Sequence, residues 1–135
     1  MRLDTFIALF FCVGVFAEEP LDCNNAWTTV QINQCMNKEL IAAETLMEQY
    51  LAKSISRYTQ DPTSVSSINK SQMIWLDYRQ AHCGAVFNTW REGTIRTAMS
   101  VDCKIKLTQQ RTHSLWTSFL TFEDSTPALL PEPQK

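Results

Sequence analysis

The stretch that decides the fold is CGAVFNTWREGTIRTAMSVDC, residues 83–103, in which two cysteines flank a central glycine. Cys83 and Cys103 each lie ten residues from Gly93. If the chain is helical on both sides and turns back at Gly93, residues at equal distances from the turn face each other. A disulfide between Cys83 and Cys103 would then fix the register of a helical hairpin and stabilise it by about 2–4 kcal/mol.

An apolar segment near the N-terminus determines how the other cysteines are interpreted. Residues 6–16 read FIALFFCVGVF, and the small residue Ala17 follows at a position that a signal peptidase inspects. This run is shorter than the roughly 20 apolar residues that cross a bilayer as a helix. We therefore expect residues 1–17 to be a secretory signal, with a retained membrane anchor as the alternative. The sequence predicts a periplasmic or secreted protein whose mature form has no membrane span.

Export would place the remaining cysteines in an oxidising compartment. Cys12 leaves with the signal, and an even number of cysteines in a small exported domain is typical of a disulfide framework. Sequence alone allows three pairings of the four. If the hairpin disulfide forms, Cys23 is left to bond Cys35, which ties the N-terminal segment to the first turns of the next helix.

Composition and periodicity indicate an all-α fold. The chain has only three glycines, and no long stretch alternates apolar and polar residues as a strand would. Apolar residues recur every three or four positions over three segments. They predict helices near residues 28–58, from a cap at Ser66 or Ser67 to about Trp90, and over residues 94–121.

The three helices account for one domain. We predict a three-helix antiparallel bundle-like domain over residues 18–122, stapled by two disulfides. Residues 123–135 contain three prolines and no periodicity, so we expect an extended Pro-rich tail.

Charge is divided unevenly along the chain, although the formal net charge is only −2. Residues 18–62 hold seven acidic and three basic residues, whereas residues 63–121 hold three acidic and seven basic residues. Seven bases spread over long helices are typical of a solvated surface rather than a nucleic-acid site. We expect a protein partner and no nucleic acid.

A second stretch, SQMIWLDYRQAHC at residues 71–83, mixes residues that serve either structure or chemistry. Trp75, Tyr78 and the turn that carries His82 lie three and four residues apart. Residues at this spacing are neighbours on a helix, so we expect them to share an inward-facing side.

Arg79 lies within the same stretch. A guanidinium at the edge of a core needs a carboxylate, and the preceding helix offers Glu44 and Glu48. We interpret Arg79 as half of a structural ion pair. The alternative is that Arg79 is a cation that binds a ligand.

The sequence contains little that points to catalysis or metal binding. His82 precedes Cys83, but Cys83 has a disulfide partner, and the only other histidine is His113. No CxxC, HExxH, glycine-rich phosphate loop or GxSxG motif occurs. We predict no enzyme, no metal and no cofactor.

Aromatic residues exceed what three helices comfortably bury. We expect most of the extra aromatics to cover the core from the helix ends. The alternative is a binding patch, because Trp and Tyr often dominate the energy of protein interfaces. The aromatics outside the expected core are Trp27, Phe87, Trp90, Trp116 and Phe122.

Four short blocks, spread over nearly the whole mature domain, resemble a known family in residue type and spacing. The third block contains the motif W-x-x-Y-R-x-x-x-C. The fourth block contains a later cysteine and the motif L-T-x-x-R-x-x-x-L. The blocks are Asp22-Cys23 with Ala26, Thr28 and Cys35; Ala43-Glu44 with Met47 and Tyr50; Ser71-Gln72 with Trp75, Tyr78-Arg79 and Cys83; and Cys103 with Leu107, Thr108, Arg111 and Leu115. The chain is similar to the LprI-like lysozyme inhibitor family of small bacterial envelope proteins.

The resemblance implies a helical, disulfide-bonded exported domain whose partner is a cell-wall hydrolase such as lysozyme. Its motif residues Trp75, Tyr78, Arg79 and Arg111 are then expected in the structural core. Because lysozymes that attack bacteria are often cationic, we expect the acids of the first helix to contact the enzyme. These acids are Glu39, Glu44 and Glu48.

A second hypothesis belongs to a different class. The basic second half would make the protein a structural or stress-related envelope module that binds anionic wall or lipid groups. Its binding residues would be Arg96, Lys104 and Lys106.

Overall fold

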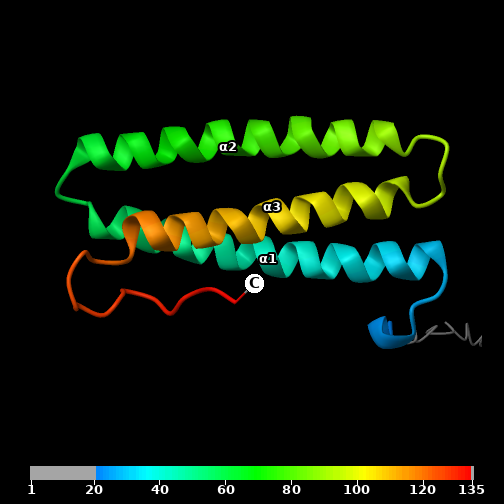
Figure 1. The fold of residues 1–135 in the computed structure, drawn as a ribbon, viewed down its shortest axis with the longest axis horizontal. Coiled ribbons are helices and arrows are strands. Elements are labelled where there is room, and N and C mark those ends of the chain that lie inside the picture. Colours follow the sequence, from blue (N-terminus) through cyan, green and yellow to red (C-terminus); the bar gives the residue numbers. More distant parts are fainter. Residues whose placement is uncertain (1–20, 135) are drawn as a thin grey trace, which may run out of the picture.

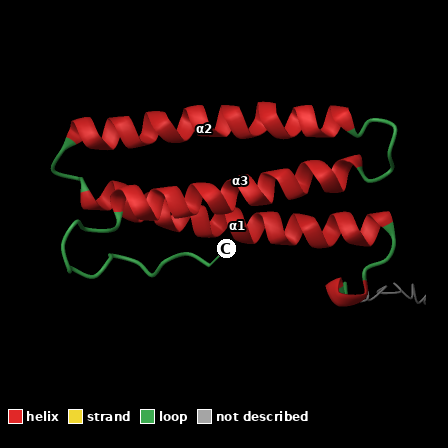
Figure 2. Ribbon diagram, in the orientation of Figure 1, coloured by secondary structure: helices red, strands yellow, loops and turns green. Residues whose placement is uncertain are grey.

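The chain folds into three long helices, as the hydrophobic periodicity predicts. The computed structural model describes residues 21–134. A short 3-10 turn at Cys23–Asn25 precedes α1 (Thr29–Arg57), α2 (Pro62–Thr89) and α3 (Arg96–Phe119), which Figure 1 shows in sequence colours. Figure 2 shows helices and loops but no strand in the described part. The all-α prediction is confirmed, whereas the predicted signal lies outside the described residues.

α1 begins where a capping box forms. The Gln31 backbone N–H donates to Thr28 Oγ1 over 3.2 Å, and the Thr28 backbone N–H donates to Gln31 Oε1 over 3.2 Å. These bonds satisfy donors at the start of the helix that have no intrahelical partner. The predicted helix at residues 28–58 therefore agrees with α1 to within one residue at each end.

α2 begins at Pro62, before the predicted caps at Ser66 and Ser67. Proline suits the first helical turn because its φ is already helical and its missing N–H is not needed there. The Asp61 side chain caps the helix, since its Oδ1 accepts from the backbone N–H groups of Thr63 and Ser64 over 3.1 and 3.2 Å. The predicted helix start was wrong, because Asp61 and Pro62 begin a helix here instead of extending a turn.

The hairpin of α2 and α3 turns through residues 90–95. Cys83 and Cys103 are bonded with an S–S distance of 2.03 Å and a Cα–Cα distance of 5.6 Å. A second disulfide joins Cys23 to Cys35 and holds the 3-10 turn against α1. Both predicted pairings are confirmed.

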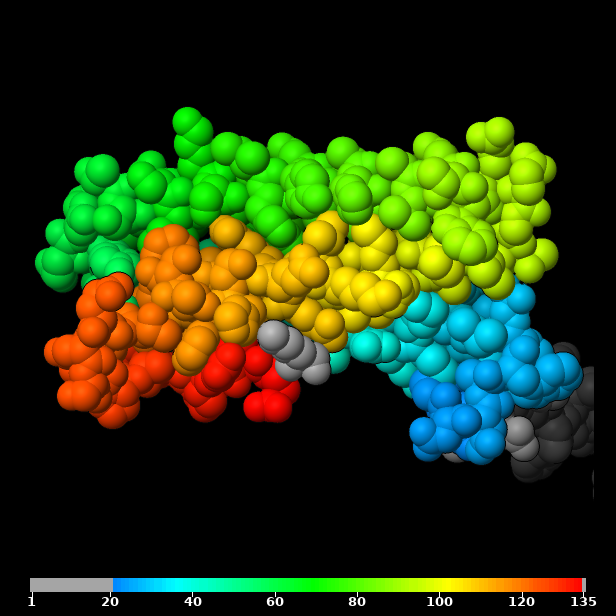
Figure 3. Space-filling model, in the orientation of Figure 1, coloured from blue at the N-terminus to red at the C-terminus, as the bar shows by residue number. Residues whose placement is uncertain are grey.

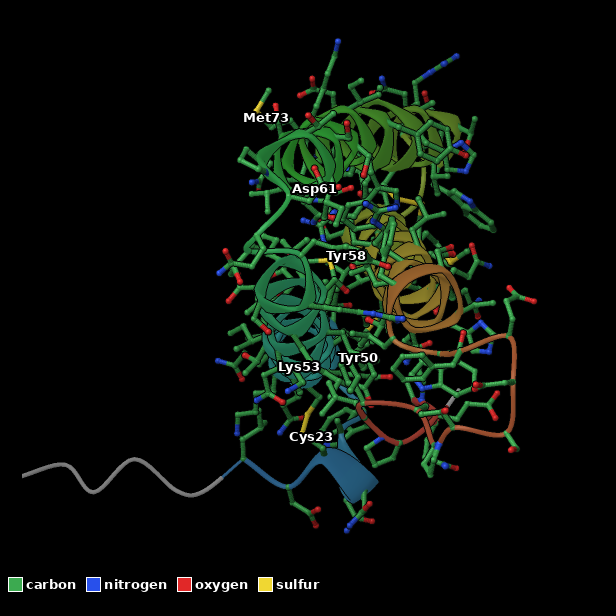
Figure 4. All side chains as sticks on the ribbon, turned by 90° about the vertical axis from the view of Figure 1, so that its left-hand side faces the viewer. Cys23, Tyr50, Lys53, Tyr58, Asp61 and Met73 are labelled. Atoms are coloured by element: carbon green, nitrogen blue, oxygen red, sulfur yellow. A yellow bond between two sulfur atoms is a disulfide. The ribbon has the colours of Figure 1, made fainter. Side chains whose placement is uncertain are left out.

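α3 lies against both other helices. The end view of Figure 4 shows α1 and α3 side by side with α2 above them. α3 packs along α1 and α2, whereas α1 and α2 approach each other closely only over a short region. Side chains therefore bridge much of the space between α1 and α2.

The hydrophobic core lies mainly between α1 and α3. Its buried members are Met47, Tyr50, Leu115 and Leu120, and partly buried residues pack around them. Burying each large aliphatic side chain stabilises the fold by about 1.5–3 kcal/mol. The surrounding residues are Leu51, Trp75, Trp116, Phe119 and Leu130.

The C-terminal tail contains no helix or strand within its described residues, and it does not project from the bundle. Figures 1 and 3 show it turning at the end of α3 and running back along the bundle. Trp116 Nε1 donates to the Leu130 carbonyl oxygen over 2.9 Å, and Tyr50 Oη donates to the Pro131 carbonyl oxygen over 2.7 Å. The boundary predicted at residue 122 thus separates two segments that pack together.

Candidate partner-binding surface

One polar cluster in the interior joins all three helices at Arg79. Arg79 Nη1 of α2 lies 2.8 Å from Glu44 Oε1 of α1 and donates to Thr108 Oγ1 of α3 over 2.7 Å. The Arg79 side chain is 14% exposed and that of Glu44 is 34% exposed, so the ion pair is partly desolvated. The structure therefore contains one of the two ion pairs that the sequence offered for Arg79.

Arg111 of α3 makes a matching set of bonds to α2. Its Nε donates to Gln72 Oε1 over 2.9 Å, and its Nη2 donates to Ser71 Oγ over 2.9 Å. Gln72 in turn donates to the Met47 sulfur of α1 over 3.4 Å. Burial lowers the pKa of Arg111 from its ordinary value, because desolvation disfavours the charged guanidinium.

Trp75 lies near both arginines. The guanidinium carbons of Arg79 and Arg111 are 5.1 Å and 5.9 Å from the centre of its ring. We call this cluster the polar brace, because its side chains link α2 both to α3 and to α1, whose backbone approaches that of α2 closely only over a short region. It consists of Glu44, Ser71, Gln72, Trp75, Arg79, Thr108 and Arg111. Each of its polar side chains other than the Trp75 indole makes at least one hydrogen bond or ion pair within the protein, which is consistent with a structural role.

Tyr78 is not part of the brace. The expectation that it faces inward was wrong, since Tyr78 is 52% exposed and stacks on the exposed His82 with ring centres 5.5 Å apart. Successive helical residues point about 100° apart. Because Arg79 points into the interior, Tyr78 is turned toward the outer surface of α2.

The predicted acidic residues do not form one patch. Glu44 is paired with Arg79, whereas Glu39 and Glu48 are exposed. These two are nine residues apart, which is about two and a half helical turns. They therefore lie on opposite sides of α1, and a single partner surface would not cover both.

The predicted basic residues are also separated. Lys106 Nζ pairs with Asp102 Oδ2 at 2.7 Å, and the Arg96 guanidinium lies 4.8 Å from the ring centre of Phe87. Lys104 is two residues from Lys106, and residues at that spacing do not share a helical face. The structure does not bring these three cations together.

Large apolar residues are exposed on α1, at Ile41, and on α2, at Met73 and Ile74, and a further group is exposed at one end of the bundle. This end is formed by residues 26–30 before and at the start of α1 and by the loop at residues 90–95, and Figure 1 shows both at the same end. We call it the open end. Trp27 is 82% exposed and Trp90 is 42% exposed. Two aliphatic residues are exposed beside them in the sequence, Val30 and Ile95.

Trp27 occupies a position where burial would be expected. It precedes the N-cap residue Thr28, and an apolar residue at that position often packs against the fourth helical residue, here Ile32. Trp27 instead leaves most of its surface in solvent, while its backbone N–H donates to Gln31 Oε1 over 3.3 Å. Its position is fixed further by the Cys23–Cys35 disulfide.

Only some of the exposed residues at the open end were predicted from the sequence. Trp27 and Trp90 were among the aromatics expected outside the core, whereas Val30 was not singled out. Ile95 falls within the third helix predicted over residues 94–121, but it is the exposed cap residue before α3. The position of the turn around Gly93 was the signal that could have shown this.

The described residues also bear on membrane and metal chemistry. No helix within residues 21–134 is long and apolar enough to cross a bilayer. In the same part of the chain, no three His, Cys, Asp or Glu residues lie close enough to hold a metal ion.

Comparison with known proteins identifies the family. A family model described as "Lysozyme inhibitor LprI" matches residues 22–115, from the N-terminal turn to the last third of α3. No curated protein and no solved structure matches the chain. The matched residues are more than half of the chain and include both disulfides and the whole polar brace. The chain therefore belongs to the LprI lysozyme inhibitor family.

Proposed function

We propose that this protein is an exported inhibitor that binds a lysozyme or a related cell-wall hydrolase. The observation that carries the proposal is the family match over residues 22–115. Inhibition of this kind requires a stable surface that docks on the enzyme, and it requires no catalytic group in the inhibitor. The proposal therefore depends on which surface makes the contact.

The open end is the surface that we assign to the enzyme. Tryptophans commonly contribute the largest share of binding energy at protein interfaces, and Trp27 and Trp90 are already exposed. A rigid binding surface loses less conformational entropy when it associates. The Cys23–Cys35 bond and the hairpin bonded at Cys83 and Cys103 provide that rigidity.

One exposed acid beside this end suits a cationic partner. Asp22 is exposed there, whereas the exposed Glu92 forms an ion pair with Arg91, whose Nε lies 3.3 Å from Glu92 Oε1. The Asn25 side chain and the Asn24 backbone N–H donate to the Asp22 carboxylate, and these bonds lower its pKa. Asp22 thus stays ionised in mildly acidic medium and can attract a basic enzyme.

Lysozyme activity on cell walls tests the proposal directly. Wild type is expected to slow the enzyme at micromolar concentration, and Trp27→Ala/Trp90→Ala should lose at least about 30-fold in apparent affinity, as for a central hot spot. Tyr78→Ala is the matched control, because it removes an exposed aromatic from the middle of α2 and should inhibit like wild type. If wild type does not slow the enzyme, lysozyme inhibition is wrong for this protein.

Charge variants separate the two sequence-based hypotheses. Neutralising Glu39 and Glu48 is expected to weaken inhibition slightly and mainly at low salt, because exposed charges far apart are screened. The envelope-module hypothesis predicts instead that binding to anionic wall or lipid groups is lost when Arg96, Lys104 and Lys106 are changed to glutamine. That result, together with no inhibition by wild type, would favour the module.

A further inference from the structure

The C-terminal tail is held by donors that recognise a peptide backbone. Trp116 Nε1 of α3 and Tyr50 Oη of α1 donate to consecutive carbonyl oxygens, those of Leu130 and Pro131, over 2.9 and 2.7 Å. Figure 4 shows Tyr50 between α1 and the returning tail. Two aromatic side chains from different helices thus donate hydrogen bonds to the main chain of an extended segment and not to its side chains.

The segment itself has the composition of an extended ligand. Proline lacks an N–H group and favours the extended polyproline conformation, so a proline-containing strand presents carbonyl acceptors without needing partners for every donor. Leu130 packs against the core cluster and Pro133 is buried. This combination of an aromatic groove and a proline-containing strand is a recurring mode of peptide recognition.

Further contacts fix the tail at both sides of these two carbonyls. The Leu129 backbone N–H donates to the Leu120 carbonyl oxygen over 2.9 Å. On the other side, His113 Nε2 and Glu132 Oε1 are 3.1 Å apart. Each contact is weak alone, but together they define the direction and register of the bound segment.

An open depression lies beside the tail on α1. It is lined by Leu46, Tyr50, Ala52, Leu130 and Pro131, together with the polar residues Gln49, Lys53 and Ser56. Open apolar space beside a bound peptide leaves room for a ligand with a larger side chain at that point. The tail lies beyond residue 115, where the family match ends, whereas Tyr50 lies within the matched residues.

We propose that the groove between α1 and α3 is a binding site for an extended peptide of the type aliphatic-Pro-x-Pro, and that residues 130–133 of this chain occupy it intramolecularly. A tethered segment has an effective concentration on the order of millimolar, so even weak intrinsic affinity keeps the groove filled. The site is separate from the open end and does not depend on lysozyme binding.

A nuclear magnetic resonance titration of the full chain tests this site. The probe is a synthetic peptide of residues 126–134, and the readout is the indole N–H resonance of Trp116. In Leu130→Ser/Pro133→Ser the chain's own tail should leave the groove. Added peptide should then bind at least tenfold more tightly than it binds wild type, and move the resonance toward its wild-type position.

Leu129→Ser is the matched control, because it makes the same change at the neighbouring exposed leucine. This variant should keep its own tail bound and should bind the added peptide no more tightly than wild type does.

Tyr50→Phe in the double variant should weaken peptide binding about two- to tenfold, which corresponds to the loss of one neutral hydrogen bond. If the double variant does not fold, Pro133→Ser alone is titrated in the same way. A folded variant that does not respond to the peptide at millimolar concentration would overturn the proposal.

Discussion

The two ends of the bundle use their aromatic residues in opposite ways. At the end formed by residues 57–62 and 116–122, which we call the closed end, the aromatics are engaged. The Arg57 guanidinium lies 4.1 Å from the ring centre of Phe122 and donates to the carbonyl oxygens of Phe119 and Thr121. At the open end, Trp27 and Trp90 remain in solvent.

This difference indicates a division of tasks along the bundle. The closed end combines buried apolar area, cation–π contacts and the returning tail, all of which stabilise the fold. The open end is held by disulfides, so its exposed tryptophans are not needed to hold the helices together. We therefore expect removal of the hairpin disulfide or of packed closed-end residues to lower stability, and changes to the exposed tryptophans of the open end to lower binding.

Removal of the hairpin disulfide should have the largest effect on stability. Cys83→Ser/Cys103→Ser is expected to lower the free energy of unfolding by about 3–5 kcal/mol, because it frees the α2–α3 loop in the unfolded state and places a hydroxyl where Cys83 is fully buried. Denaturant unfolding measures this. Cys23→Ser/Cys35→Ser, at the open end, should cost less stability but weaken inhibition. The reverse order of stabilities would contradict the proposed division.

Leu120→Ala tests the closed end. Leu120 is fully buried, so truncation should lower the free energy of unfolding by about 2–5 kcal/mol. The tail should loosen as well, because Leu130 packs against the core cluster to which the Leu120 side chain belongs. The folded variant should still inhibit lysozyme, and loss of inhibition at a temperature where it is folded would show that the closed end also binds the enzyme.

Arg79→Ala tests the polar brace. It should lower the free energy of unfolding by about 2 kcal/mol, less than the 3–5 kcal/mol for a fully buried pair, because water can reach the partly exposed Glu44 carboxylate. Arg79→Lys should recover part of the loss but not the bond geometry. An unchanged melting temperature with loss of partner binding would show that Arg79 is a ligand-binding cation after all.

Trp27→Ala should barely alter stability, and Trp90→Ala should cost little more. Trp27 is 82% exposed, so its change in unfolding free energy is expected within about 0.5 kcal/mol, whereas Trp90 is 42% exposed and should lose about 1 kcal/mol. Thermal unfolding of the single variants checks this against their inhibition. A clear loss of stability would mean that these tryptophans support the fold.

The smallest effect is expected at the cap of α2. Hydrogen bonds from the Ser64 side chain and backbone, and from Thr63, lower the pKa of Asp61 in the folded protein. Its contribution to stability is therefore present above the carboxyl's unfolded pKa and disappears as the pH falls through the lowered folded pKa. Asp61→Asn, which keeps a capping oxygen, should reduce this acid sensitivity, as circular dichroism at decreasing pH would show.

The parts of the fold that were predictable are those that local sequence determines. The symmetry of Cys83 and Cys103 about Gly93 fixed the hairpin, because a disulfide requires its two residues to be close. Hydrophobic periodicity located the three helices. The start of α2 was missed because Asp61 and Pro62 suit a turn and a helix N-terminus equally well.

The parts that were missed depend on distant partners. Tyr78 has helical spacing from Trp75, but the position of α3 decides which side of α2 is covered. The tail has no periodicity, and it is held by Tyr50 from far along the chain. Glu39 and Glu48 were grouped because they lie on the same helix. Their spacing of nine residues, about two and a half turns, nevertheless places them on opposite sides of that helix.

Hydrogen exchange of the protein with and without lysozyme tests the central claim most directly. We predict that the enzyme slows exchange of the backbone amides in residues 22–34 and 88–98, which form the open end and the helical turns next to it. Amides in residues 57–64 and 119–125 should exchange at the same rate in both samples. Protection confined to the closed end or to the middle of α2 would contradict the claim that the open end binds the enzyme.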